Sequence, residues 1–201
     1  MNVSMIAGTP EEYQKIKEAT LELKFNMASD LFTGSLLKTL AASKPSGRFL
    51  ELGTGTGLAT AWILDGMDKK SSLVTIENNA LLIDVAKKYI RDSRVEFILA
   101  DAYQWISEYQ GEKFDFIFAD AMPGKYDLFD ETIAMLNRGG LYIIDDMVSQ
   151  PNWPTGHDEK VTSFISQLEE RNDLILTKLN WSTGIIIVAK MNNKNQLQGI
   201  T

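Results

Sequence analysis

The sequence predicts an α/β fold in which helices cover a doubly wound, Rossmann-like sheet. From Arg48 onward, short apolar runs alternate with patterns of helical period, as in successive βαβ units. A glycine-rich turn, Gly53-Thr54-Gly55-Thr56-Gly57, joins the first apolar run to the helix after it. Two further runs, 174–179 and 184–189, are too close together for a crossover helix, so they pair antiparallel or lie apart.

Two helices precede the alternating part and are expected to flank the sheet or cover a ligand. Thr9 and Pro10 provide an N-cap and a proline at the first helical position, which predicts a helix to about Lys24. A second helical pattern covers 31–42 and ends near Pro45. The later elements are expected as strand 49–52, helix 57–67, strand 72–76, helix 79–91, strand 95–99, helix 102–109, strand 114–119, helix 126–136, strand 141–145 and helix 158–171.

The glycine turn has the properties of a ligand cradle. Glycine accepts positive φ and lets the backbone approach a ligand, while free N–H groups at the start of the next helix point towards it. A dinucleotide fingerprint would place its third glycine where Leu58 stands, so Glu51 and Gly57 fit a nucleoside without a pyrophosphate better. Glu77 follows Gly57 by 20 residues and can accept hydrogen bonds from ribose hydroxyls. The alternative is a tight βα turn without a ligand.

These residues resemble a known family. The run Glu51 to Gly57, with Glu77 downstream, looks like the S-adenosylmethionine site of class I methyltransferases. Asp120-Ala121 and the segment Gly139 to Asp146 narrow the resemblance to metal-dependent O-methyltransferases related to catechol and caffeoyl-CoA methyltransferases. The resemblance covers about Met27 to Lys190. It implies a seven-stranded sheet whose last strand is antiparallel, and methyl transfer to a hydroxyl of a small, catechol-like or otherwise hydroxylated molecule.

The resemblance also assigns residues to the cofactor. The glycine loop would hold its amino-acid end, Glu77 its ribose, and Asp101 with Ala102 its adenine. Two assignments have alternatives, because Asp101 also suits a helix N-cap and Met27 also suits core packing. The complete cofactor set is Met27, Glu51, Gly53, Gly55, Gly57, Glu77, Asn78, Asp101, Ala102 and Asp120.

Three acids at neighbouring strand ends, Asp120, Asp145 and Asp146, predict a metal site. Carboxylates gathered at one edge repel one another unless a cation or protons intervene, and oxygen ligands suit Mg²⁺, Mn²⁺ or Ca²⁺. The alternative is that they cap loops. The resembling family usually has Asp-Asn at the second place, whereas this chain has Asp145-Asp146.

The candidate catalytic residues are Asp120, Lys125 and His157. In the resembling family a lysine three residues after the first metal acid is the usual proton acceptor, but Pro123 stands there, with Lys125 two residues on. His157, the single histidine, lies in the loop after the acids and has a pKa range suited to general base work. Both side chains could instead be incidental. Trp153 would either wall an aromatic acceptor or pack on the sheet edge.

Composition sets further limits on the function. The 201 residues suit a single methyltransferase domain, with a helical cap at 1–45, a Rossmann-like core at 46–190 and a polar tail at 191–201. A net charge of −7 argues against general binding of nucleic acid or anionic membrane. The chain has no cysteine, no secretion signal and no long apolar segment, which predicts a cytoplasmic protein. The resemblance implies a homodimer.

Two other functions compete with the O-methyltransferase. An NAD-linked oxidoreductase is disfavoured by Leu58 at the third-glycine position and by the lack of an evident Ser-Tyr-Lys set. A methyltransferase fold kept as a non-catalytic binding subunit would bind the cofactor without transferring a methyl group.

Overall fold

The computed structural model describes residues 6, 8–150 and 153–191, and these form a mixed sheet of seven strands between two layers of helices. The strands are β1 (Arg48–Leu52), β2 (Ser72–Glu77), β3 (Val95–Leu99), β4 (Phe114–Ala119), β5 (Leu136–Ile144), β6 (Leu174–Leu179) and β7 (Ile185–Lys190). The helices are α1 (Tyr13–Glu22), α2 (Leu31–Ala42), α3 (Leu58–Gly66), α4 (Ala80–Tyr89), α5 (Ala102–Glu108), α6 (Phe129–Ala134) and α7 (His157–Glu169).

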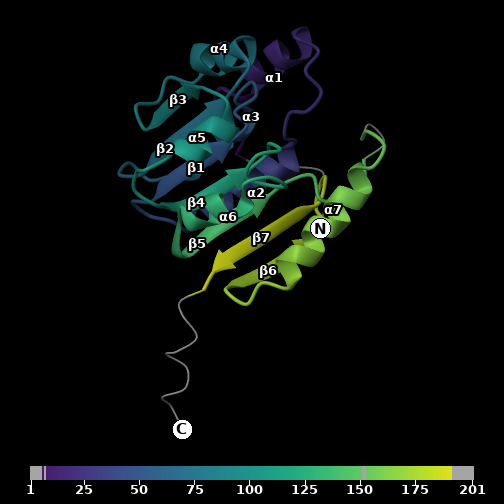
Figure 1. The fold of residues 1–201 in the computed structure, drawn as a ribbon. Helices are drawn as coiled ribbons and strands as arrows, with labels where there is room; N and C mark the ends of the chain where they lie inside the picture. The colour runs from purple at the N-terminus through teal and green to yellow at the C-terminus, as the bar shows by residue number, and fades with distance from the viewer. Residues whose placement is uncertain (1–5, 7, 151–152, 192–201) are drawn as a thin grey trace.

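The strand order is β3-β2-β1-β4-β5-β7-β6, so the winding reverses between β1 and β4. The first five strands pair in parallel, and β7 is antiparallel to both of its neighbours, β5 and β6. The predicted doubly wound sheet with an antiparallel last strand is therefore confirmed. Figure 1 shows the sheet from β3 at one edge to β6 at the other, with α7 beside β6 and β7.

Each face of the sheet has its own apolar core. On one face the core contains residues of α1, α2, α3 and α4 with Phe49, Phe116 and Phe118 of the strands. On the other face it contains residues of α5, α6 and α7 with Ile117 and Ile144. Because both faces of the central strands are covered, β4 is apolar along almost its whole length, as parallel strands usually are.

The largest difference from the predicted elements lies between β4 and β5. The helix expected at 126–136 is limited to Phe129–Ala134, and β5 begins at Leu136 rather than at 141. An irregularity in the β4–β5 register, between Phe114 and Phe116, lets Leu136 pair with Phe114 before the regular ladder resumes at Leu141. Early pairing of this kind depends on the partner strand and leaves no periodic signal in the sequence.

Other predicted bounds differ by a few residues, and two predictions fall outside the described part. The first helix begins at Tyr13, after a turn closed by Tyr13 N–H and the Pro10 carbonyl, rather than at Pro10 with Thr9 as its N-cap. The polar start before Ile6 and the tail 192–201 lie outside the described residues. Within the described residues no helix is long and apolar enough to cross a membrane.

Candidate active site

The glycine turn after β1 has a fixed shape because its side chains are anchored inward. Gly53 and Gly57 have φ values of 99° and 94°, which favour glycine. The Thr54 hydroxyl lies 2.6 Å from that of Thr75, and the Thr56 hydroxyl lies 2.7 Å from that of Thr20 in α1. With both threonines turned into the protein, the open side of the turn presents backbone.

Glu77 at the end of β2 is joined to the same turn. Its Oε2 accepts a hydrogen bond from Gly55 N–H at 2.8 Å, and its Oε1 accepts one from Asn79 N–H at 2.9 Å. Asn78 is exposed beside it. The glycine turn and Glu77, the acid predicted to bind ribose, therefore lie together.

Glu51, the last residue but one of β1, is fully buried beneath the glycine turn. Its Oε2 accepts hydrogen bonds from the Thr60 and Thr75 hydroxyls, each at 2.5 Å, whereas its Oε1 is buried without a hydrogen-bond partner among the described residues. Burial raises the pKa of Glu51 to about 7, which the two hydroxyls only partly offset. The side chain supports the turn from below and is not in contact with solvent.

The remaining predicted cofactor residues lie after β3 and before α2. Asp101 is the N-cap of α5 and accepts from Tyr103 N–H at 2.7 Å, so its capping role is present in the structure, and Ala102 follows it as the first helical residue. Met27 is 70% exposed, which argues against core packing. Phe25, two residues earlier, lies 3.2 Å from where a Cβ on Gly55 would be.

Asp120 links the glycine turn to a second cluster that we call the acid edge, namely Asp120, Asp145 and Asp146. Asp120 N–H donates to the Leu52 carbonyl at 3.0 Å, and the Asp120 carbonyl lies 2.7 Å from where a Cβ on Gly53 would be. Asp145 follows the adjacent strand and is only 3% exposed. Burial, together with the neighbouring Asp145, raises the pKa of Asp120 well above its usual range, and burial raises that of Asp145 to about 6.

Two carboxylate oxygens of the acid edge already have protein donors. Asp145 Oδ1 accepts from the Thr183 hydroxyl at 2.5 Å and from Asp146 N–H at 2.8 Å. Asp120 Oδ2 accepts from the Ser29 hydroxyl at 3.1 Å. Sequence reasoning missed Ser29 and Thr183, because neither belongs to a motif and each meets its acid from a distant part of the chain.

Lys125 is buried beside the acid edge, with only 4% of its surface exposed. Its charge lowers the pKa values of both Asp120 and Asp145 against the larger effect of burial. The turn that carries it is held in place, since Gly124 N–H donates to the Asp127 carbonyl at 2.7 Å and the Tyr142 hydroxyl donates to the Gly124 carbonyl. This predicted catalytic residue is therefore buried on a fixed turn and its charge acts on the predicted metal acids, but within the described residues it forms no ion pair with them.

His157 lies in an aromatic group at the start of α7 rather than among the acids. Its ring centroid is 4.4 Å from that of Trp153, and its Nε2 is 3.4 Å from the Tyr126 hydroxyl. Tyr126 lies between the two groups, because it follows Lys125 in the chain, and burial together with the Asp146 charge raises its pKa. Trp153 packs against the core face that carries α7.

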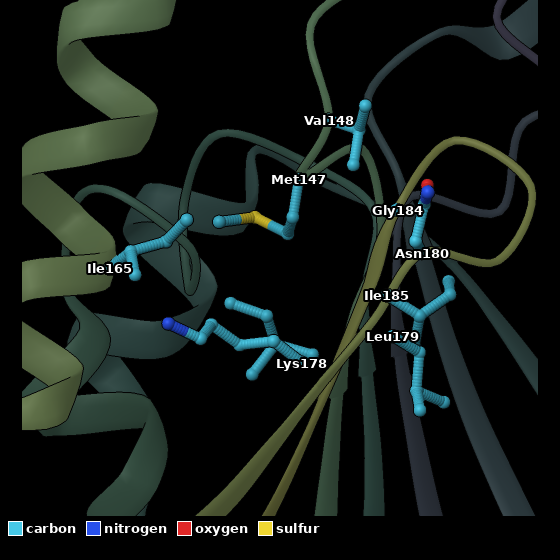
Figure 2. Close-up of a pocket in the computed structure, with 9 residues that line it drawn as sticks. Met147, Val148, Ile165, Lys178, Leu179, Asn180, Gly184 and Ile185 are labelled. Atoms are coloured by element: carbon cyan, nitrogen blue, oxygen red, sulfur yellow. The ribbon is translucent and has the colours of Figure 1, made fainter.

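A mostly apolar pocket adjoins the acid edge between α7 and the hairpin of β6 and β7. Met147 and Val148, which directly follow the acids, line it together with Ile165 of α7 and Lys178 of β6. Figure 2 shows the Met147 side chain directed into the space between the helix and the hairpin, with Lys178 reaching across below it. The acids therefore have an apolar surface as their neighbour.

The strand order defines a Rossmann-like fold of the methyltransferase type. At the carboxyl ends of its strands lie the glycine turn, the acid predicted to bind ribose and the row of carboxylates. A family model described as O-methyltransferase matches residues 4–190. The chain belongs to this O-methyltransferase family.

Individual proteins agree with the family assignment. The catechol O-methyltransferase of Mycobacterium tuberculosis is 27% identical over 120 residues, which are 57% of this chain and 54% of that protein. The chain spans 62% of the length of a relative from Mycobacterium marinum and 52% of one from Mycobacterium ulcerans. Among solved structures, the O-methyltransferase TomG of Streptomyces achromogenes, in complex with SAM, superposes with a TM-score of 0.79 at 23% identity, covering 94% of this chain and 93% of that one.

Proposed function

We propose that this chain is an S-adenosylmethionine-dependent O-methyltransferase acting on a small hydroxylated molecule. The observation that carries the proposal is the glycine turn: its threonines point inward, its amide at Gly55 is bound to Glu77, and Asp120 lies against Gly53. This arrangement fits a nucleoside whose ribose meets the carboxylate and whose other end lies over backbone groups. Membership of the O-methyltransferase family and the bound SAM of TomG support the same choice.

When bound, S-adenosylmethionine supplies the methyl group: the acceptor oxygen forms a bond to the methyl carbon, the carbon–sulfur bond breaks with its electron pair on sulfur, and the acceptor proton leaves to water. The residues of the chain have to align the acceptor with the turn, which is mainly a matter of orientation. The proposed cofactor contacts are the set predicted from the sequence, with Asp120 at the boundary between cofactor and acceptor.

The acid edge, in this arrangement, does not fit the predicted divalent ion. Mg²⁺ takes six oxygen ligands in near-octahedral geometry, of which one or two are usually carboxylates and several are waters. Within the described residues, no group of three or more His, Cys, Asp or Glu side chains is placed to hold one, and Asp145 is engaged by Thr183 and by its own neighbour. We therefore derive no step through a metal. Turnover measured after EDTA treatment, and again with added Mg²⁺, tests the predicted Mg²⁺ requirement.

The proposed acceptor site lies at the acid edge, between Lys125 and the aromatic group of Tyr126, Trp153 and His157. The pocket of Figure 2 adds an apolar surface beside it, which suits a molecule with an apolar body and a polar hydroxyl. The net charge of −7 supports a small acceptor over a nucleic acid. The homodimer and the cytoplasmic location remain predictions from the sequence.

Calorimetric titration with S-adenosylhomocysteine, in parallel with NAD, tests the proposal. We expect binding of the nucleoside, its loss in Glu77→Ala, and little effect in Glu96→Ala, an acid on the neighbouring strand β3 away from the turn. Tight NAD binding without binding of the nucleoside would overturn the proposal. Nucleoside binding without methyl transfer to any member of a panel of phenols and catechols would favour the non-catalytic binding subunit.

A further inference from the structure

A continuous path of hydrogen bonds joins Asp120 to Asp145 through the start of α2 and the loop between β6 and β7. We propose that Asp30 and Ser182, whose side chains meet in the middle of this path, are positioning residues for methyl transfer, because their contact sets the two acids relative to one another. The inference rests on the proposed function and concerns how the same site aligns its acceptor. We call residues 29–32 and 181–183 the clamp.

Each end of the clamp is a hydrogen bond to one of the two acids. The Ser29 hydroxyl donates to Asp120 Oδ2 at 3.1 Å. The Thr183 hydroxyl donates to Asp145 Oδ1 at 2.5 Å. These two donors come from distant parts of the chain, so the spacing of the acids depends on what connects the donors.

Asp30 and Ser182, the neighbours of those donors in the chain, supply the connection. The Ser182 hydroxyl donates to Asp30 Oδ2 at 2.6 Å. Asp30 uses its other oxygen, Oδ1, to cap α2, where it accepts from Phe32 N–H at 2.8 Å and from Thr33 N–H at 2.9 Å. The carboxylate that meets Ser182 is therefore fixed by the helix that it begins.

A second contact attaches the same loop to α2. Trp181 Nε1–H donates to the Phe32 carbonyl at 3.0 Å, and the two rings meet edge to face with their centroids 5.5 Å apart. An aromatic pair of this geometry is stabilising beyond the area that it buries. This attachment holds Ser182 within reach of Asp30.

The other side of the loop is held against the segment that follows the acids. Met147 N–H donates to the Gly184 carbonyl at 3.0 Å, and Val148 N–H donates to the Thr183 carbonyl at 2.9 Å. Gly184 has φ of 89°, and a Cβ there would lie 2.5 Å from the Val148 nitrogen, so both the conformation and the close approach require glycine. A displacement of the loop would therefore be passed to the backbone beside the acid edge.

The exposure of the Asp30–Ser182 contact separates its effect on the acceptor from its effect on folding. Both residues are exposed, and a hydrogen bond at the surface competes with water, so its removal changes stability little. Alignment is more sensitive, since a displacement of about 1 Å can slow a reaction about a hundredfold. The clamp contains no residue of the glycine turn. Its loss is therefore expected in acceptor turnover and not in cofactor affinity.

Ser182→Ala in the full chain tests the clamp, because it removes the contact with Asp30 and leaves the α2 cap and the Thr183 hydroxyl in place. Turnover is measured as S-adenosylhomocysteine release with the best acceptor from a panel of phenols and catechols. We expect kcat/KM for the acceptor to fall about tenfold, with the calorimetric affinity for S-adenosylhomocysteine unchanged.

Ser43→Ala is the matched control. It removes another exposed serine hydrogen bond, 2.6 Å long to the Leu40 carbonyl, at the opposite end of α2, and should behave as wild type. A wild-type kcat/KM in Ser182→Ala, or an equal fall in Ser43→Ala, would overturn the inference.

Asp30→Ser breaks the same contact from the other side. Serine remains a good N-cap, so α2 keeps its start, but its single hydroxyl replaces the two oxygens that serve both the cap and Ser182. We expect the same fall in kcat/KM as in Ser182→Ala and no further fall in the double variant, because both changes remove one interaction. Losses that multiply in the double variant would contradict a shared contact and overturn the inference.

Hydrogen exchange gives a measurement that does not depend on turnover. The amides of Met147 and Val148 are bonded to the loop, so peptides that contain them should exchange faster in Ser182→Ala than in wild type or in Ser43→Ala. Unchanged exchange would show that the clamp does not hold the acid edge and would overturn the inference. Absence of nucleoside binding in the wild-type chain would instead refute the proposed function, and the exchange rates would still decide whether the clamp exists.

Discussion

The glycine turn and the acid edge lie against each other, yet they are stabilised in opposite ways. The turn is held by hydrogen bonds, in which threonine hydroxyls pair with one another and the Glu77 carboxylate accepts from a backbone amide. The acid edge places the half-buried Asp120 beside the buried Asp145, and the charge of Lys125 acts on both carboxyls. The turn is therefore held by hydrogen bonds within the protein, whereas the acid edge depends on a balance of charge that an acceptor or a substitution can change.

The contact between the two regions is expected to be the most sensitive point. Gly53→Ala would place a Cβ 2.7 Å from the Asp120 carbonyl at a φ of 99°, so backbone strain and overpacking add together. We expect a loss of about 4 kcal/mol in the free energy of unfolding, measured with urea, and loss of S-adenosylhomocysteine binding.

Gly139→Ala is the matched control, because its φ is 72° but a Cβ there would meet nothing within 4 Å. It should show strain alone, about 1 kcal/mol. Equal losses of unfolding free energy in the two variants would mean that the close approach of the turn to Asp120 does not add to the destabilisation.

Replacing Glu51 tests how the buried carboxyl beneath the glycine turn affects stability as the pH changes. Because burial raises its pKa from 4.5 to about 7, the folded chain binds a proton more tightly than the unfolded chain. The free energy of unfolding should therefore fall as pH rises from 4.5 to 7, by about 3 kcal/mol from this group. Glu51→Gln should flatten the urea-derived stability profile by that amount, while Asp120 and Asp145 contribute in the same sense to both proteins. Parallel profiles would show that Glu51 is not the source.

Substitutions of Thr183 test how strongly its hydroxyl stabilises the acid edge. Thr183→Val removes the 2.5 Å hydrogen bond to the buried Asp145, whose Oδ1 then keeps only the Asp146 amide as a donor, and this should cost about 2 kcal/mol at pH 7. Thr183→Ser retains the hydroxyl and should recover most of that loss in the same urea titration. If the serine and valine variants are equally destabilised, the packing of the Thr183 methyl group matters and the hydrogen bond does not.

The sequence predicts the glycine turn better than the acid edge, for a physical reason. Glu77 is readable because a strand ending 20 residues after Gly57 has a fixed place in a βαβ unit. Ser29 and Thr183 reach their acids across 91 and 38 residues, so their contacts depend on how the layers are assembled. The burial of Lys125 runs against the usual exposure of lysine and arises from the turn at Gly124, which no local pattern reports.

The smallest expected effect concerns the boundary of the cofactor site. Asp101 caps α5 through one hydrogen bond to Tyr103 N–H, and Asn79 caps α4 in the same way through Leu81 N–H. Replacing either residue by alanine should cost about 1 kcal/mol of stability. A larger loss of S-adenosylhomocysteine affinity in Asp101→Ala than in Asn79→Ala would show that Asp101 also meets the adenine. Equal affinities would limit Asp101 to its role as a cap, and the cofactor contacts would then be confined to the turn, Glu77 and the residues that touch them.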